Sequence, residues 1–225
     1  KKQLELAMKL DGNFVELYSA HAFICNRLGM HEQAESSLQT GLSISQKKDY
    51  KIGESAIYNV FSIVKYAQGK YKDAKIYSEK ALEIQVNYSN RLQEAKFRSN
   101  YASSLSALNL IDLSFEQSKV ALKIKEDLED FKSITTSYAV LANTYLTISN
   151  FSEAKIYALK ALANSRKFGL NNLEFKILAL IIDILNSCAN YTEIEKYINL
   201  AKMKFDEFNE PFLFAKIDLA ICHYN

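Results

Sequence analysis

Apolar residues recur along this chain at steps of three and four positions. Two such sets lie between positions 51 and 88: Tyr58, Phe61 and Val64, then Ala74, Tyr77 and Ala81. An α-helix has about 3.6 residues per turn, so this spacing places each set on one face of a helix, whereas a strand would show strict alternation. The pattern predicts paired amphipathic helices joined by short polar segments.

A second regularity has a period of 40 residues. Small or turn-forming residues fill one column in five copies: Gly29, Gly69, Asn109, Ser149 and Ala189. Two further columns follow at fixed offsets: Ala34, Ala74, Ser114, Ala154 and Ile194, then Gly41, Ala81, Ala121, Ala161 and Ala201. Small side chains let two helices approach closely while bulky neighbours fill the adjoining grooves. A fixed period of this length is typical of solenoids, and it predicts a stack of antiparallel helix pairs.

The columns and turn residues define the helices that we expect. The first helices of the pairs should span 13–28, 52–68, 92–108, 132–148, 172–188 and 211–224. The second helices should span 31–47, 71–88, 111–129, 151–168 and 191–208, and residues 1–10 should end a preceding second helix. Gly169 is predicted to be a left-handed residue after a helix, and Pro211 to lie in the first turn of one. We expect one repeat domain over 1–225, with about five full repeats and partial repeats at both ends, and interpret it as a fragment of a larger protein.

These columns resemble the tetratricopeptide repeat, in which a small residue on the first helix is followed by a glycine, an aromatic residue and two alanines around the second. Gly69, Tyr71, Ala74 and Ala81 match that pattern best. The period of 40 rather than 34 is similar to a longer-helix variant seen in cell-polarity scaffolds and bacterial peptide-sensing regulators. The resemblance implies an all-α fold, a right-handed α-α superhelical solenoid of stacked helix-turn-helix repeats whose first helices line a groove.

By the same resemblance, ten groove positions are candidates for binding a peptide or partner segment: Asn59, Tyr66, Lys96, Asn100, Ser103, Thr136, Asn143, Lys176, Asp183 and Asn186. An amide side chain has both a donor and an acceptor, so it can pair with the backbone of an extended peptide of any sequence. Phe23, Ile63 and Tyr66 would take apolar side chains, and the two lysines acidic ones. The competing interpretation is that solvent-facing positions of a chain rich in Asn and Ser hold these residues in any case.

Some family members bind a terminal carboxylate through a Lys on the first helix. The corresponding positions here hold no Lys: they are Ser19, Asn59, Ser99, Ala139 and Ala179. This difference argues against that class of ligand.

Two functions of different class remain open. The first is a non-catalytic protein–protein interaction scaffold that binds a peptide or partner segment in its groove. The alternative is a ligand-sensing regulatory domain of a larger bacterial signalling or transcription-control protein. Exposed or terminal helices would in addition offer a route to a homo-oligomer.

Charge and hydropathy exclude other classes of partner. The formal net charge is +2 and no Lys/Arg cluster stands out, whereas nucleic acid and anionic membranes need a clustered basic footprint. The longest apolar run, Ile177 to Ile182, is far shorter than the roughly 20 residues of a membrane-spanning helix. We therefore expect neither nucleic acid nor membrane to bind this segment.

Residues that carry chemistry are sparse and scattered. His21, His31 and His223 are too far apart in sequence for a metal motif, and no nucleophile or phosphate-loop pattern occurs. We therefore expect no enzymatic activity, no metal and no cofactor. The cysteines, Cys25, Cys188 and Cys222, lie in apolar helical stretches and are interpreted as reduced core residues, which favours a cytoplasmic location.

Overall fold

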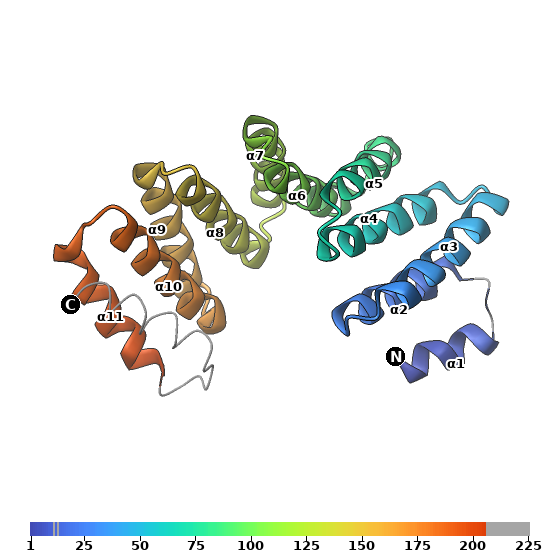
Figure 1. Ribbon diagram of the computed structural model, residues 1–225, viewed down its shortest axis with the longest axis horizontal. Helices are drawn as coiled ribbons and strands as arrows, with labels where there is room; N and C mark the ends of the chain where they lie inside the picture. Colours follow the sequence, from blue (N-terminus) through green and yellow to red (C-terminus); the bar gives the residue numbers. More distant parts are fainter. Residues whose placement is uncertain (11, 13, 206–225) are drawn as a thin grey trace. The chain divides into compact units, whose positions relative to one another are not determined.

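The computed structural model describes residues 1–10, 12 and 14–205, and these residues form helices without any strand (Figure 1). The helices are α1 (Lys2–Leu10), α2 (Val15–Arg27), α3 (His31–Lys47), α4 (Lys51–Ala67), α5 (Tyr71–Gln85), α6 (Arg91–Ala107), α7 (Ile111–Asp127), α8 (Phe131–Thr147), α9 (Phe151–Lys167), α10 (Asn171–Ser187) and α11 (Tyr191–Phe205). The predicted boundaries that fall within the described residues are confirmed to within about three residues, and the predicted helix end at 208 lies outside them. The predicted helix 211–224, with Pro211, Cys222 and His223, lies outside the described residues.

The turn inside each helix pair has the same geometry in all five repeats. Its left-handed residue comes from the turn column: Gly29 (φ 73°), Gly69 (φ 73°), Asn109 (φ 59°), Ser149 (φ 59°) and Ala189 (φ 54°). The next backbone N–H then reaches back to close the preceding helix, as from Met30 to the carbonyl oxygen of Cys25 at 2.9 Å. This is the Schellman arrangement, which favours residues that tolerate a positive φ. Gly169, after α9, has a φ of 62°, as predicted.

The described residues divide into two compact units, the first up to Ile124 and the second from Lys125, so that the division falls within α7. In the first unit, Ala22, Ala34, Leu38 and Ile57 are buried in one cluster. A Cβ atom on Gly41 of α3 would lie 2.9 Å from the Tyr18 Cβ and 2.7 Å from the Ile57 Cδ1. The small column therefore marks the point where α3 approaches α2 and α4 most closely.

The second unit has its own core around α9 and α10. Ala154, Ala161 and Ile182 are buried there, and the Tyr145 and Tyr157 rings stack at 5.5 Å between centroids. The predicted burial of the small columns is thus confirmed in both units. It is burial of apolar surface at each helix junction that stabilises such a stack.

The two cysteines among the described residues have different environments. Cys25 is buried in the core of the first unit, as predicted. The prediction was wrong for Cys188, which is exposed. Cys188 is the C-cap residue of α10, and its backbone leaves the helix there, so its side chain is not held against the neighbouring helix.

Candidate functional site

The first helix of each pair, termed here an A helix, keeps one face accessible to solvent. The A helices are α2, α4 and α6 in the first unit and α8 and α10 in the second. The accessible positions of the first unit are three or four residues apart: Glu16, Ser19 and Phe23 on α2, Ala56, Asn59, Ile63 and Tyr66 on α4, and Lys96, Asn100 and Ser103 on α6. We term this set the A face of the first unit. Because helical positions at this spacing share a side, each helix contributes one continuous row.

Two of the predicted residues meet directly on this face. The Asn100 side-chain amide donates to the Asn59 Oδ1 at 2.8 Å, and both side chains are half-buried. The bond uses one donor of Asn100 and one acceptor of Asn59, so the pair still presents amide N–H groups from Asn59 and the carbonyl oxygen of Asn100. A donor and an acceptor presented side by side match the C=O and N–H groups of a peptide backbone.

The other three predicted residues of the first unit differ in how available their side chains are to a ligand. Lys96 lies one turn before Asn100, is exposed and forms no ion pair with the described part of the chain. Ser103 lies one turn after Asn100, but its hydroxyl donates to the Ser99 carbonyl oxygen at 3.1 Å, within its own helix. Tyr66 is 41% exposed and its ring packs against Tyr71, with 5.2 Å between centroids. Lys96 is thus the most available of the three for a ligand.

The remaining predicted residues lie in the second unit. Thr136 and Asn143 are exposed on α8, and Lys176 is exposed on α10. Asp183 and Asn186 are half-buried on α10. The predicted amides therefore fall into two sets, one on the A helices of each unit.

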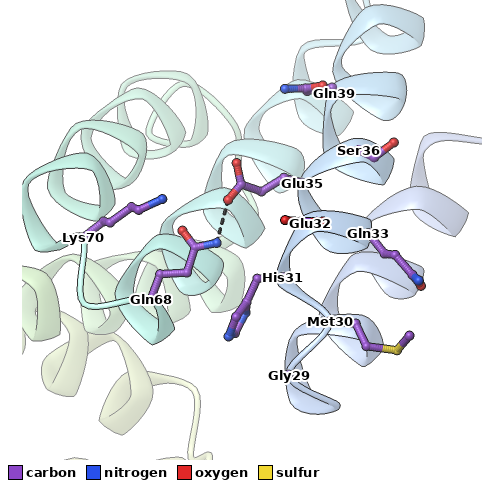
Figure 2. A pocket seen from close by; sticks show the side chains of 10 residues that line it. All are labelled: Gly29, Met30, His31, Glu32, Gln33, Glu35, Ser36, Gln39, Gln68 and Lys70. Carbon is purple, nitrogen blue, oxygen red and sulfur yellow. Dashed lines mark hydrogen bonds between the residues drawn. The ribbon is translucent and has the colours of Figure 1, made fainter.

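A hollow of about 920 Å³ lies elsewhere in the first unit, at the beginning of α3 and beside the turn between α4 and α5 (Figure 2). Glu35 of α3 faces Gln68 there: the Gln68 amide donates to the Glu35 Oε1 at 2.6 Å and Lys65 to its Oε2 at 2.7 Å. Burial alone would raise the pKa of Glu35, but the hydrogen bonds from Lys65 and Gln68 outweigh it and lower the pKa. Since both carboxylate oxygens are occupied, the group cross-links two helix pairs.

Sequence reasoning missed this cross-link. The position of Glu35 carries little signal, because the other repeats have Lys75, Phe115, Lys155 and Glu195 there. Lys65 is the clearer signal, since it is a charged residue where other repeats have Cys25 and Leu105. A charged residue at a position that is apolar in the other repeats is a candidate for a contact specific to that junction.

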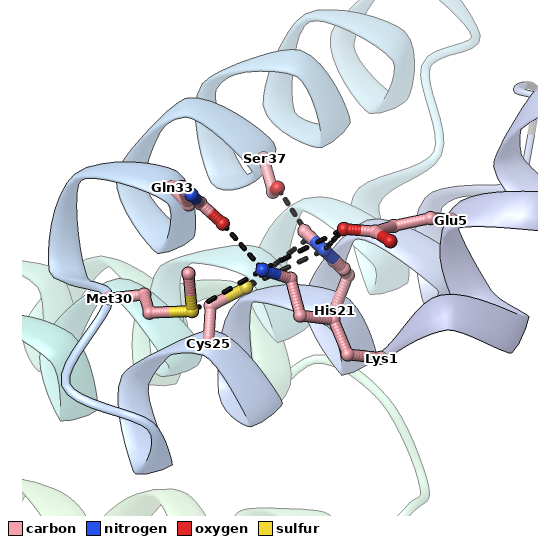
Figure 3. Close-up of polar contacts among 7 residues, drawn as sticks. All are labelled: Lys1, Glu5, His21, Cys25, Met30, Gln33 and Ser37. Atoms are coloured by element: carbon pink, nitrogen blue, oxygen red, sulfur yellow. Dashed lines mark hydrogen bonds and ion pairs between the residues drawn. The ribbon is translucent and has the colours of Figure 1, made fainter.

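A second polar cluster joins α1 to α2 and α3 (Figure 3). The His21 Nε2 lies 3.5 Å from the Cys25 Sγ and 3.5 Å from the Glu5 Oε1, and its Nδ1 lies 2.8 Å from the Ser37 Oγ. A thiol, an imidazole and a carboxylate are also the parts of a cysteine nucleophile, but that chemistry needs an accessible thiolate. Cys25 is fully buried, and burial raises its pKa despite the opposing charge of Lys1. The cluster is therefore a packing contact.

The described residues present neither a metal-binding cluster nor a membrane-spanning helix. They contain no group of three or more His, Cys, Asp or Glu arranged to hold a metal ion. Nor do they contain a helix whose length and apolar character would let it span a bilayer.

Comparison with known proteins agrees with this architecture. Residues 14–87 match the sequence model of the tetratricopeptide repeat family. A search of curated proteins by sequence finds no match. The fold is similar to BtubC (BKLC) from P. vanneervenii, with a TM-score of 0.79, 18% identity, and 92% of this chain and 87% of that chain covered.

Two further solved structures contain similar folds. A Rap protein complexed with Competence and Sporulation Factor has a TM-score of 0.76 at 13% identity, over 90% of this chain and 57% of that chain. A signal transduction ATPase with a tetratricopeptide repeat sensor from Pyrococcus horikoshii has a TM-score of 0.78 at 18% identity, over 90% of this chain and 32% of that chain. Residues 14–87 therefore match the tetratricopeptide repeat family, and the described helix pairs as a whole have a fold similar to that of tetratricopeptide-repeat structures.

Proposed function

We propose that the chain is a non-catalytic scaffold whose A face in the first unit binds an extended peptide segment of a partner protein. The observation that carries this proposal is the hydrogen bond between Asn59 and Asn100. It holds two amides of neighbouring A helices together with a donor and an acceptor directed to the same ligand, a pairing suited to a backbone in extended conformation.

The surroundings of the pair support a peptide rather than a small charged ligand. Phe23 and Ile63 provide accessible apolar surface on α2 and α4, and Lys96 provides a positive charge on α6. Half-burial of the two amides lowers the local dielectric, which strengthens hydrogen bonds made there. The second unit offers a further polar set that again includes two amides and a lysine: Thr136, Asn143, Lys176, Asp183 and Asn186.

Selection from a library of unstructured peptides tests the proposal. The full chain should retain peptides, and the double variant Asn59→Ala/Asn100→Ala should bind the same peptides about 10- to 30-fold more weakly, as expected from two lost hydrogen bonds. The matched control is Gln39→Ala/Asn87→Ala, which removes two exposed amides from the second helices and their flanks. Equal retention of every peptide by all three proteins would contradict the proposal.

A second candidate function is a ligand-sensing domain of a larger bacterial signalling or transcription-control protein. The similarity in fold to a Rap protein complexed with a factor and to the sensor of a signal transduction ATPase favours it. The reduced, buried thiol of Cys25 suits the cytoplasmic location that such a role requires. If an effector domain adjoins the repeats in the full-length protein, selected peptides should change its activity. An unchanged effector activity would leave the adaptor function as the better account.

A further inference from the structure

Four side chains of the A face lie in one diagonal row across two helices. Ile63 and Asn59 are one turn apart on α4, the Asn59 amide bonds to Asn100 on α6, and Lys96 is one turn before Asn100. Residues four apart on a helix are neighbours on its surface. The order along the row is therefore Ile63, Asn59, Asn100, Lys96.

The two ends of this row have opposite chemistry. At one end, Ile63 occupies the repeat position that Phe23 occupies on the neighbouring helix α2, where the Phe23 ring is 41% exposed. At the other end, the exposed Lys96 has no acidic partner in the described part of the first unit. A bound peptide would complement the row if it placed an apolar side chain over Ile63 and an acidic side chain beside Lys96. Its backbone would then lie over the amide pair between them.

The length of the row sets the spacing of those groups. Each of its three steps is roughly 5 Å, so the row spans on the order of 15 Å, which an extended chain covers in about four or five residues at roughly 3.3 Å per residue. Successive side chains of an extended chain point to opposite sides, so two of them face the same surface only at an even separation. Four residues is the separation that meets both conditions.

We infer, on the basis of the proposed function, that the segment bound by the first unit carries an apolar and an acidic side chain four residues apart. The apolar side chain packs against Phe23 and Ile63, and the carboxylate pairs with Lys96. The amides of Asn59 and Asn100 pair with the backbone between them.

Designed peptides test this spacing on the full chain. Labelled nine-residue peptides of Ser and Thr would carry one Phe and one Glu at positions i and i+3, i and i+4, or i and i+5, in both orders. The Ser/Thr background is chosen to avoid other strong contacts, and Thr favours extended conformations. Fluorescence anisotropy should give the lowest Kd at a separation of four, by about tenfold, because only there are both groups directed to the face. Equal affinities at the three separations would overturn the inference.

A charge reversal tests the acidic half separately. Lys96→Glu should weaken binding of the four-residue Phe–Glu peptide roughly twofold to fivefold and improve binding of the matching Phe–Lys peptide to a similar extent. Lys119→Glu, the same charge change at an exposed position of α7, should alter neither affinity. The same response in both variants would contradict a role for Lys96.

The outcomes separate this inference from the function on which it rests. If binding depends on Asn59 and Asn100 but not on spacing or charge, the scaffold function stands and the inference fails. If no library peptide and no designed peptide binds the full chain, both fail.

Discussion

Asn100 donates a hydrogen bond to Asn59 at 2.8 Å, across 41 positions of sequence and between two neighbouring A helices. The separation is one residue more than the repeat, so the bond joins adjacent rather than equivalent positions. It shows that the accessible rows of α4 and α6 border one another, and it makes one continuous surface of them.

This pair should show energetic coupling. In a double-mutant cycle of Asn59→Ala and Asn100→Ala, we expect an interaction energy of about 0.5–1.5 kcal/mol, the usual net contribution of one hydrogen bond. Urea unfolding of the four proteins at equal concentration measures it. Fully additive single-variant effects would mean that the two side chains do not interact in solution.

The small columns should resist enlargement. Ala74 is fully buried where α5 packs against α4, so Ala74→Leu should lower the free energy of unfolding by about 1–3 kcal/mol through overpacking. The control Ala107→Leu makes the same change at an exposed position near the end of α6. In thermal unfolding, Ala74→Leu should have a lower midpoint than Ala107→Leu. Equal midpoints would show that the site around Ala74 has room for the larger side chain.

The left-handed turn positions predict a stabilising substitution. Ala189 has a φ of 54°, a conformation that costs an alanine about 1–2 kcal/mol. Ala189→Gly should relieve that strain and, after the greater chain entropy of an unfolded glycine, raise the free energy of unfolding by about 0.5 kcal/mol. Asn109→Gly should gain less, because Asn tolerates this region. Chemical unfolding measures both gains in the free energy of unfolding, and a larger gain for Asn109→Gly than for Ala189→Gly would contradict this account.

Glu35 should make stability depend on acid pH. Its pKa is lowered in the folded chain from an ordinary value of 4.5, because the donors Lys65 and Gln68 outweigh the effect of burial. The unfolded chain takes up the proton at a higher pH than the folded chain. The contribution of Glu35 to the free energy of unfolding is therefore present above about pH 4.5 and is lost as the pH falls through the folded pKa.

The variant Glu35→Gln should therefore be less stable than the wild type by about 0.5–1 kcal/mol at pH 7, the range of a partly solvated ion pair. The difference should shrink as the pH falls below about 4. Glu32→Gln, at an exposed glutamate on the same helix, is the control. Thermal unfolding across pH 3 to 7 measures both, and a difference for Glu35→Gln that did not change with pH would rule out its charge as the cause.

Much of the fold could be predicted because it is encoded by local patterns. Helix boundaries follow from apolar spacing and from turn residues such as Gly69, and the burial of Ala74 and Ala154 follows from their recurrence at one position of the repeat. These features depend on interactions within one helix pair or between equivalent positions of neighbouring pairs. A single regular sequence with a fixed period is enough to specify them.

The contacts between non-equivalent positions could not be predicted in this way. The bond of Asn59 to Asn100 and the pairing of Glu35 with Lys65 both depend on how far one helix is rotated and shifted against the next. Side-chain volumes along the whole junction determine that rotation and shift, and a shift of one residue changes which polar groups meet. The sequence by itself determined the helix pairs and their repeat, and the tertiary structure decided which side chains lie together on the accessible A face.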